Sequence, residues 1–179
     1  MPAVELPYAA VQSAGWLVQA VKEFGLLVGV GGITRSSHAR ESGMLGADFI
    51  AAAVTAPDVV AACREMDVLC ILASLTPTEV WRAQEMEADL IKVQAEALGG
   101  PDYIRSLRET LSVRRLMAAE VPLDGYLPFL EAGVEALEFK SSLALPDLAK
   151  EQEWAEISRR ASEISNACRT WKASRDRGC

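Results

Sequence analysis

The sequence predicts an α/β protein of the (β/α) TIM-type barrel class, incomplete, with about seven βα units. Short apolar segments alternate with amphipathic ones about every 20–25 residues, as in βα repeats. Several apolar segments lack polar alternation, which is typical of parallel strands covered on both faces. The chain has 179 residues, 50% of them hydrophobic, so it can form one domain with a sizeable core. A doubly wound sheet is the alternative architecture.

The predicted strands follow the chain in order. The six clearest apolar segments are Leu26–Val30, Asp48–Val54, Val68–Leu75, Ala88–Gln94, Arg115–Ala119 and Val134–Phe139. Met1–Leu6 is expected to add one more short strand at the beginning.

The segments between these strands carry helix signals. Thr76–Glu79 combines a Thr N-cap, a proline at the first helical position and a glutamate three residues after the cap. Similar starts or an apolar stripe predict helices over Gln12–Phe24, Ser36–Leu45, Val59–Met66, Tyr103–Leu111 and one long last helix from Pro146 to Trp171. We therefore expect a single domain over residues 1–171, followed by a polar, frayed tail over 172–179.

Composition narrows the function. A net charge of −7 argues against nucleic-acid binding and against docking on anionic membranes. No apolar run reaches the roughly 18–20 residues of a membrane span, and no basic stretch precedes an apolar one at the N-terminus. The four cysteines form no CxxC pair and His38 is the only histidine, so no metal site is expected. Reduced thiols favour the cytoplasm, although a removed N-terminal extension would allow an organelle.

Two ionisable residues lie where charge is costly. Lys92 interrupts the apolar segment Ala88–Gln94, and a buried ammonium costs several kcal/mol unless it is paired or neutral. A lowered pKa would make this amine a nucleophile for carbonyls. The alternative is an edge-strand lysine, or one paired with Asp89 or Glu96. Glu5 lies in the first short strand and is either an acid/base with a raised pKa or a surface charge.

A glycine-rich turn follows the first long strand. The glycines of Val28–Thr34, including Gly31 and Gly32, are too closely spaced for a dinucleotide-binding fingerprint. They indicate a tight turn that lets the backbone approach a ligand or a neighbouring strand. His38 follows in a polar stretch and is interpreted as a plain surface residue.

The region around Lys92 resembles the 2-keto-3-deoxy-6-phosphogluconate/4-hydroxy-2-oxoglutarate aldolases, which are class I enzymes on a (β/α)8 barrel. That family has a Thr-Pro-(Ser/Thr)-Glu helix start, then a strand with the Schiff-base lysine, then a Gly-Gly-Pro-x-Tyr helix start. The same order and approximate spacing run here from Leu75 to Ile104, with one residue missing after the lysine. With gaps, the likeness extends from Glu5 to Pro146.

The resemblance implies roles for individual residues. Lys92 would form the Schiff base, and Glu5 would shuttle protons. Ser142, Gly31 and Gly32 would contact the substrate. The implied reaction splits a 4-hydroxy-2-keto acid into pyruvate and an aldehyde, with no cofactor because the lysine itself is the electron sink. It also implies a homo-oligomer, in this family a trimer. The alternatives are an impaired aldolase-like barrel that acts as a binding or scaffold protein, and an unrelated enzyme.

The departures from the family pattern concern the barrel and its substrate contacts. The family's first βα unit has no counterpart, so the chain is a truncated product, or a neighbouring subunit or rearranged N-terminus covers the gap. The family's phosphate loop is replaced by Ala118–Pro122, whose Glu120 repels phosphate. Tyr8 stands where the family has a carboxylate-binding arginine. We therefore expect a non-phosphorylated substrate, with Lys140 and Arg35 supplying positive charge.

Overall fold

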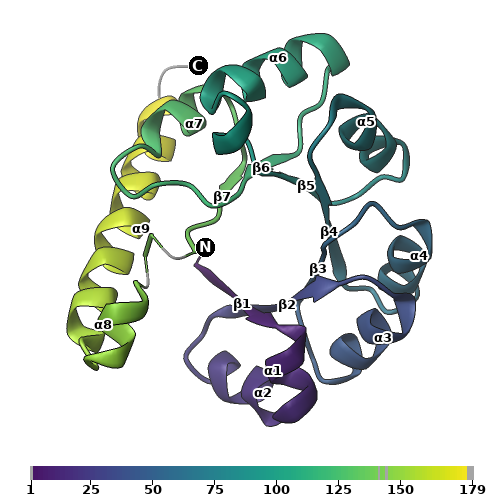
Figure 1. The fold of residues 1–179 in the computed structure, drawn as a ribbon, viewed down its shortest axis with the longest axis vertical. Coiled ribbons are helices and arrows are strands. Elements are labelled where there is room, and N and C mark those ends of the chain that lie inside the picture. Colours follow the sequence, from purple (N-terminus) through teal and green to yellow (C-terminus); the bar gives the residue numbers. More distant parts are fainter. Residues whose placement is uncertain (1, 141, 144, 177–179) are drawn as a thin grey trace.

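The computed structural model describes residues 2–140, 142–143 and 145–176, and its centre is one curled sheet of seven parallel strands in sequential order (Figure 1). The strands are β1 (Ala3–Pro7), β2 (Leu27–Ile33), β3 (Phe49–Ala52), β4 (Leu69–Ser74), β5 (Leu90–Val93), β6 (Leu116–Ala118) and β7 (Ala136–Leu137). The predicted incomplete α/β barrel is confirmed, and every predicted strand corresponds to an observed one.

Helices surround the outer face of this sheet (Figure 1). They are α1 (Tyr8–Ser13), α2 (Trp16–Lys22), α3 (Ser36–Met44), α4 (Pro57–Glu65), α5 (Pro77–Glu85), α6 (Pro101–Leu111), α7 (Leu127–Glu131), α8 (Pro146–Lys150) and α9 (Trp154–Asp176), with a 3₁₀ turn η1 (Glu96–Leu98). The capping box predicted for α5 is present: the Thr76 hydroxyl accepts from the Glu79 N–H, and the Glu79 carboxylate accepts from the Thr76 N–H at 2.8 Å. None of the described helices is long and apolar enough to cross a membrane.

Two helix predictions were wrong in detail. The segment Gln12–Phe24 forms parts of α1 and α2, because Ala14 leaves the helical region with φ −149° and ψ 67°. The last helix is interrupted between α8 and α9, where Gln152 takes a φ of +58°. Conversely, the expected frayed segment from Lys172 is helical through Asp176, because it contains no glycine or proline before Gly178. Residues 177–179 lie outside the described part.

Side chains alternate between two cores. Ile50, Leu72 and Ile91 point outward and pack under the helices in the main core. Phe49, Ala51 and Ile71 point inward and form a second cluster on the concave face, together with Leu27, Leu90 and Met117. The inner cluster fills the barrel below the carboxyl ends of the strands, so the space above it is left for a site.

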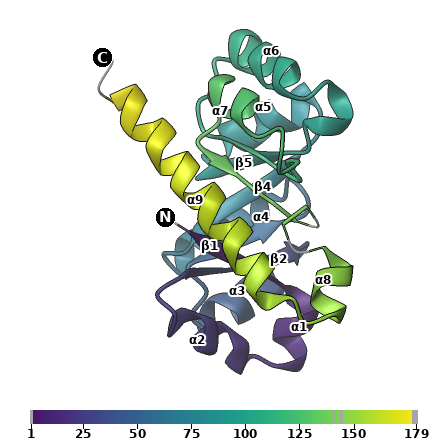
Figure 2. The same cartoon turned by 90° about the vertical axis from the view of Figure 1, so that its left-hand side faces the viewer.

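The sheet does not close. Within the described residues β1 pairs only with β2, and β7 pairs only with β6. Helix α9 runs across the outside of this opening in both views (Figures 1 and 2). Its Cys168 and Trp171 are half-buried against the main core. The opening between β1 and β7 is therefore covered from outside by a helix rather than filled by a strand.

Candidate active site

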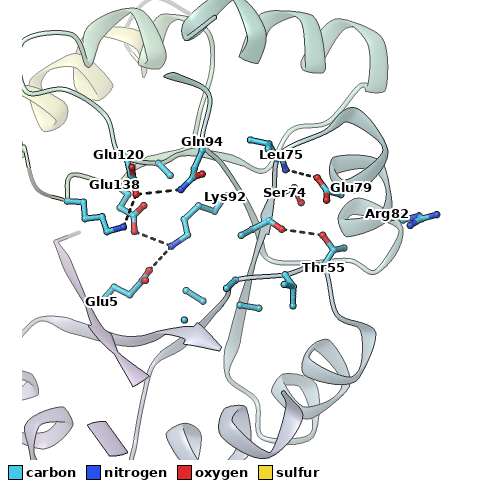
Figure 3. A pocket seen from close by; sticks show the side chains of 18 residues that line it. Glu5, Thr55, Ser74, Leu75, Glu79, Arg82, Lys92, Gln94, Glu120 and Glu138 are labelled. Atoms are coloured by element: carbon cyan, nitrogen blue, oxygen red, sulfur yellow. Dashed lines mark hydrogen bonds and ion pairs between the residues drawn. The ribbon is translucent and has the colours of Figure 1, made fainter. Parts of the chain in front are cut away.

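Lys92 lies on the concave face near the carboxyl end of β5. Leu90 belongs to the inner cluster and Ile91 to the outer core, so strand alternation sends Lys92 inward. Its Nζ donates to Glu5 Oε2 at 2.9 Å and to Glu138 Oε1 at 3.1 Å (Figure 3). The side chain of Lys92 is only 14% exposed. The structure therefore brings together Lys92 and Glu5, which the sequence singled out separately, and adds Glu138 as a third member.

The expected lowering of the Lys92 pKa was wrong. Burial does lower the pKa of this amine, but the charges of Glu5 and Glu138 and their hydrogen bonds outweigh it and raise the pKa above 10.5. The alternative partners proposed from the sequence are not the ones observed: Asp89 accepts from the Cys70 N–H at 2.8 Å. Lys92 is thus a positively charged ammonium at neutral pH in the substrate-free protein.

Glu138 is a site residue that the sequence reasoning missed. It follows β7, and its main chain is fixed on both sides: its N–H donates to the Ala118 carbonyl at 2.8 Å, and its carbonyl accepts from the Val121 N–H at 2.9 Å. A signal for it existed, because Glu138 lies in the apolar segment Val134–Phe139 just as Glu5 lies in the first strand. A search for every carboxylate inside a predicted strand would have found it.

The glycines of β2 make room for the site. A Cβ on Gly31 would overlap the Glu5 carboxylate, so the missing side chain allows Glu5 to lie where it does. Gly32 lines the cavity with a φ of +76° and has open space beside it. The role of Gly31 in this structure is therefore to accommodate Glu5, and substrate contact by either glycine stays a prediction.

A cavity of about 570 Å³ opens beside Lys92 at the carboxyl ends of the strands. Its ionisable lining residues are four carboxylates and three cations: Glu5, Glu79, Glu120, Glu138, Arg82, Lys92 and Lys140. Arg82 points away from the other labelled side chains (Figure 3), while Lys140 donates to Glu120 at 2.7 Å. The cavity therefore offers no surplus of positive charge toward Lys92.

The remaining expected residues lie differently. The Ser142 hydroxyl donates to the Val121 carbonyl at 2.8 Å, and Ser142 is not among the residues that line the cavity. Its contact with substrate stays a prediction. Arg35 also lies outside the lining, so the cation expected from it is not supplied there.

Tyr8 and His38 form a contact of their own. Their rings stack with centroids 4.2 Å apart, and the Tyr8 hydroxyl donates to Glu41 at 2.6 Å. His38 is thus more than a plain surface residue, because it supports the turn from β1 into α1. No group of three or more potential metal ligands gathers anywhere in the described ranges.

The sequence itself matches no family model and no curated protein. Solved structures, however, share its fold. A KDPG aldolase from Legionella pneumophila, with pyruvate captured as a covalent carbinolamine intermediate, is 15% identical; the match covers 89% of this chain and 79% of that one, with a TM-score of 0.75. A 4-hydroxy-2-oxoglutarate/2-dehydro-3-deoxyphosphogluconate aldolase is 24% identical over 89% and 80% of the two chains, with a TM-score of 0.72.

The same fold also occurs with other chemistry. An orotidine 5′-phosphate decarboxylase from Pyrococcus horikoshii is 15% identical over 88% of each chain, with a TM-score of 0.66. The resemblance drawn from the Lys92 region is therefore confirmed at the level of the fold. Because one fold carries different chemistries, the residues of the site and not the fold determine the function.

Proposed function

We propose that this protein is a class I aldolase that splits a 4-hydroxy-2-keto acid into pyruvate and an aldehyde. The single observation that carries the proposal is the position of Lys92 Nζ, 2.9 Å from the Glu5 carboxylate beside the cavity. An amine and a proton-transfer group within hydrogen-bond reach are what imine chemistry needs. The fold shared with aldolases supports the proposal.

The reaction requires the amine to lose its positive charge first. A proton leaves Nζ for a neighbouring carboxylate, and the free amine attacks the 2-keto carbon to give a carbinolamine. Loss of water then leaves a protonated imine. The C4 hydroxyl gives up its proton, the C3–C4 bond breaks, and its electron pair moves into the enamine of pyruvate. Protonation of C3 and hydrolysis of the imine release pyruvate and restore Lys92.

The charges around the cavity favour a substrate without phosphate. Glu120 lines the cavity and accepts from Lys140 at 2.7 Å, so this cation is already paired and Glu120 adds a negative charge that would repel a phosphate. We expect kcat/KM to be higher for 4-hydroxy-2-oxoglutarate than for 2-keto-3-deoxy-6-phosphogluconate. A strong preference for the phosphorylated acid would contradict this part of the proposal.

Borohydride trapping tests the proposal directly. Pyruvate and sodium borohydride should leave a reduced pyruvate adduct on Lys92, located by peptide mass spectrometry. Lys92→Met should lose the adduct, whereas Lys150→Met, which removes a lysine exposed by 76% on α8, should keep it. A wild-type protein that forms no adduct at saturating pyruvate would support the alternative, an aldolase-like barrel that acts as a binding or scaffold protein.

A further inference from the structure

We infer that Glu138 is a second catalytic carboxylate: it takes the proton from the Lys92 ammonium during imine formation and stays as the counter-ion of the iminium. Glu5 is thereby left to act on the protons of the substrate. This inference rests on the proposed function and names a residue for the same site.

The geometry places one cation between two anions. Lys92 Nζ lies 2.9 Å from Glu5 Oε2 and 3.1 Å from Glu138 Oε1, so each carboxylate can accept one of its protons directly. One carboxylate comes from the edge strand β1 and the other from the residue directly after the edge strand β7, and the amine comes from β5 between them (Figure 3). Of the other polar groups that line the cavity, Lys140 and Gln94 both donate to Glu120 rather than to these two carboxylates.

The charge count explains why two carboxylates are useful. The resting group of Lys92, Glu5 and Glu138 carries one positive and two negative charges. When a proton moves from Nζ to one carboxylate, the group consists of a neutral amine, an acid and one carboxylate, and its net charge is unchanged. The nucleophile can therefore form inside the cavity with no proton exchanged with bulk water, despite the raised pKa of Lys92.

The subsequent steps return that proton. The neutral amine attacks the carbonyl carbon, and the Glu138 acid protonates the carbonyl oxygen. The second Nζ proton passes through a carboxylate to the carbinolamine hydroxyl, which leaves as water as the C=N bond forms. The iminium that results again faces two carboxylates. One of them neutralises it, and the other is free to remove the C4 hydroxyl proton before C3–C4 cleavage.

The difference in burial assigns the two roles. Glu138 is held by main-chain hydrogen bonds to Ala118 and Val121, and its side chain is 18% exposed. The Glu5 side chain is 28% exposed, and it lies against Gly31 with no side chain between them. Main-chain pairing fixes both residues, since Glu5 lies within β1 opposite Gly29, so exposure is what separates them. The better-shielded Glu138 suits a permanent partner of Nζ. The more exposed one suits contact with a substrate in the cavity.

The experiment separates amine activation from carbon chemistry. Two rates are measured: borohydride trapping of the pyruvate imine across neutral and alkaline pH, and exchange of the pyruvate methyl hydrogens in deuterated water. Glu138→Gln should slow trapping at neutral pH by about 10²-fold, the scale of general acid/base catalysis, with a rate that rises steeply with pH. Glu5→Gln should trap within a few-fold of wild type and lose most of the methyl exchange.

The control is Glu135→Gln, which removes one negative charge from the same segment at an exposed position. It should leave both rates unchanged. If Glu138→Gln does not fold, as judged by circular dichroism, Glu138→Asp provides the test, because it keeps the charge and withdraws the carboxylate by one methylene. Trapping should then slow with no change in net charge.

The outcomes distinguish the two proposals. A wild-type protein without any adduct overturns the proposed function itself. A wild-type adduct combined with an unchanged rate and pH profile in the Glu138 variants overturns only the role of Glu138. Slow trapping in Glu5→Gln but not in Glu138→Gln would reverse the assignment and also overturn it.

Discussion

The two sides of this barrel differ in how firmly they are built. On the closed side, each of the four residues of β3 is buried, and β2 and β4 have strands on both flanks. On the open side, no residue of β1 or β7 is buried. Both of these strands have only one neighbour within the described residues. The core therefore stabilises one side strongly, and the other depends on fewer contacts.

The chemistry is divided along the same line. Lys92 comes from β5, which has a neighbour on each flank, whereas Glu5 lies in the edge strand β1 and Glu138 directly follows the edge strand β7. The ammonium thus contacts both edges of the opening at once. One ion-paired lysine therefore serves two purposes here: it is the candidate nucleophile, and it links the two edges of the sheet, which no backbone pairing joins within the described residues.

The largest effect should appear in the closed side. Leu72 is fully buried on β4, so Leu72→Ala should lower the free energy of unfolding by about 3–4 kcal/mol, through lost apolar burial and a residual cavity. Leu137 on β7 is only half-buried, and Leu137→Ala should cost about 1–2 kcal/mol. Urea unfolding of both variants measures the difference. Equal losses would mean that the open side is packed as firmly as the closed one.

The strands on that closed side could be predicted best from the sequence. Strands β3 and β4 lie entirely within the predicted segments Asp48–Val54 and Val68–Leu75, because continuous burial leaves a continuous apolar signal. On the open side, the predicted strand Val134–Phe139 shrinks to the two residues of β7. A strand with one neighbour has fewer hydrogen bonds to define its ends. The hydrophobic pattern of the sequence does not show how many neighbours a strand has, so it does not predict where such a strand ends.

The candidate site also could be predicted only in part. Lys92 and Glu5 could be singled out because each is a charge inside an apolar segment. Their pairing could not be derived from periodicity, since 87 positions separate them, and Glu138 lies 46 positions from Lys92. The prediction of a lowered Lys92 pKa failed for this reason. The local sequence pattern indicates that Lys92 is buried, but the two carboxylates that raise its pKa lie far from it in the sequence. Only the curvature of the sheet brings them together.

Two glycines on β2 give a second test, of intermediate size. A Cβ on Gly29 would overlap the ring of Phe49 in the inner cluster, so Gly29→Ala should cost about 2–3 kcal/mol by overpacking. A Cβ on Gly31 would overlap the Glu5 carboxylate, the end of a side chain that can turn away. Gly31→Ala should therefore cost about 1 kcal/mol or less.

The effects of the two variants on catalysis should be in the opposite order to their effects on stability. Gly31→Ala displaces Glu5 from Lys92 and should slow methyl exchange of pyruvate, whereas Gly29→Ala should leave the exchange rate of the folded protein near that of wild type. Thermal denaturation and proton exchange in deuterated water are the two measurements. A Gly31 variant with wild-type exchange would show that the position of Glu5 tolerates displacement.

The last stability effect, smaller than those of Leu72→Ala and Gly29→Ala, tests the link across the opening. Lys92→Met leaves two carboxylates facing each other without a cation, and should cost about 1–2 kcal/mol at neutral pH, less than for a fully buried pair because these side chains are partly exposed. Hydrogen exchange should accelerate in β1 and β7 and stay unchanged in β3. Uniform acceleration in all three strands would mean that the lysine supports the whole sheet rather than its edges.

The sign of the pH dependence follows from the pKa of Lys92. Folding raises this pKa above its usual 10.5, so the ion pairs contribute their full stability below that pH. The contribution disappears as the pH rises through the folded-state pKa, where wild-type Lys92 becomes neutral like the methionine of the variant. The difference in unfolding free energy between wild type and Lys92→Met should therefore shrink above about pH 10.5. A difference that persists at higher pH would mean that packing of the lysine stem, and not its charge, joins the two edges.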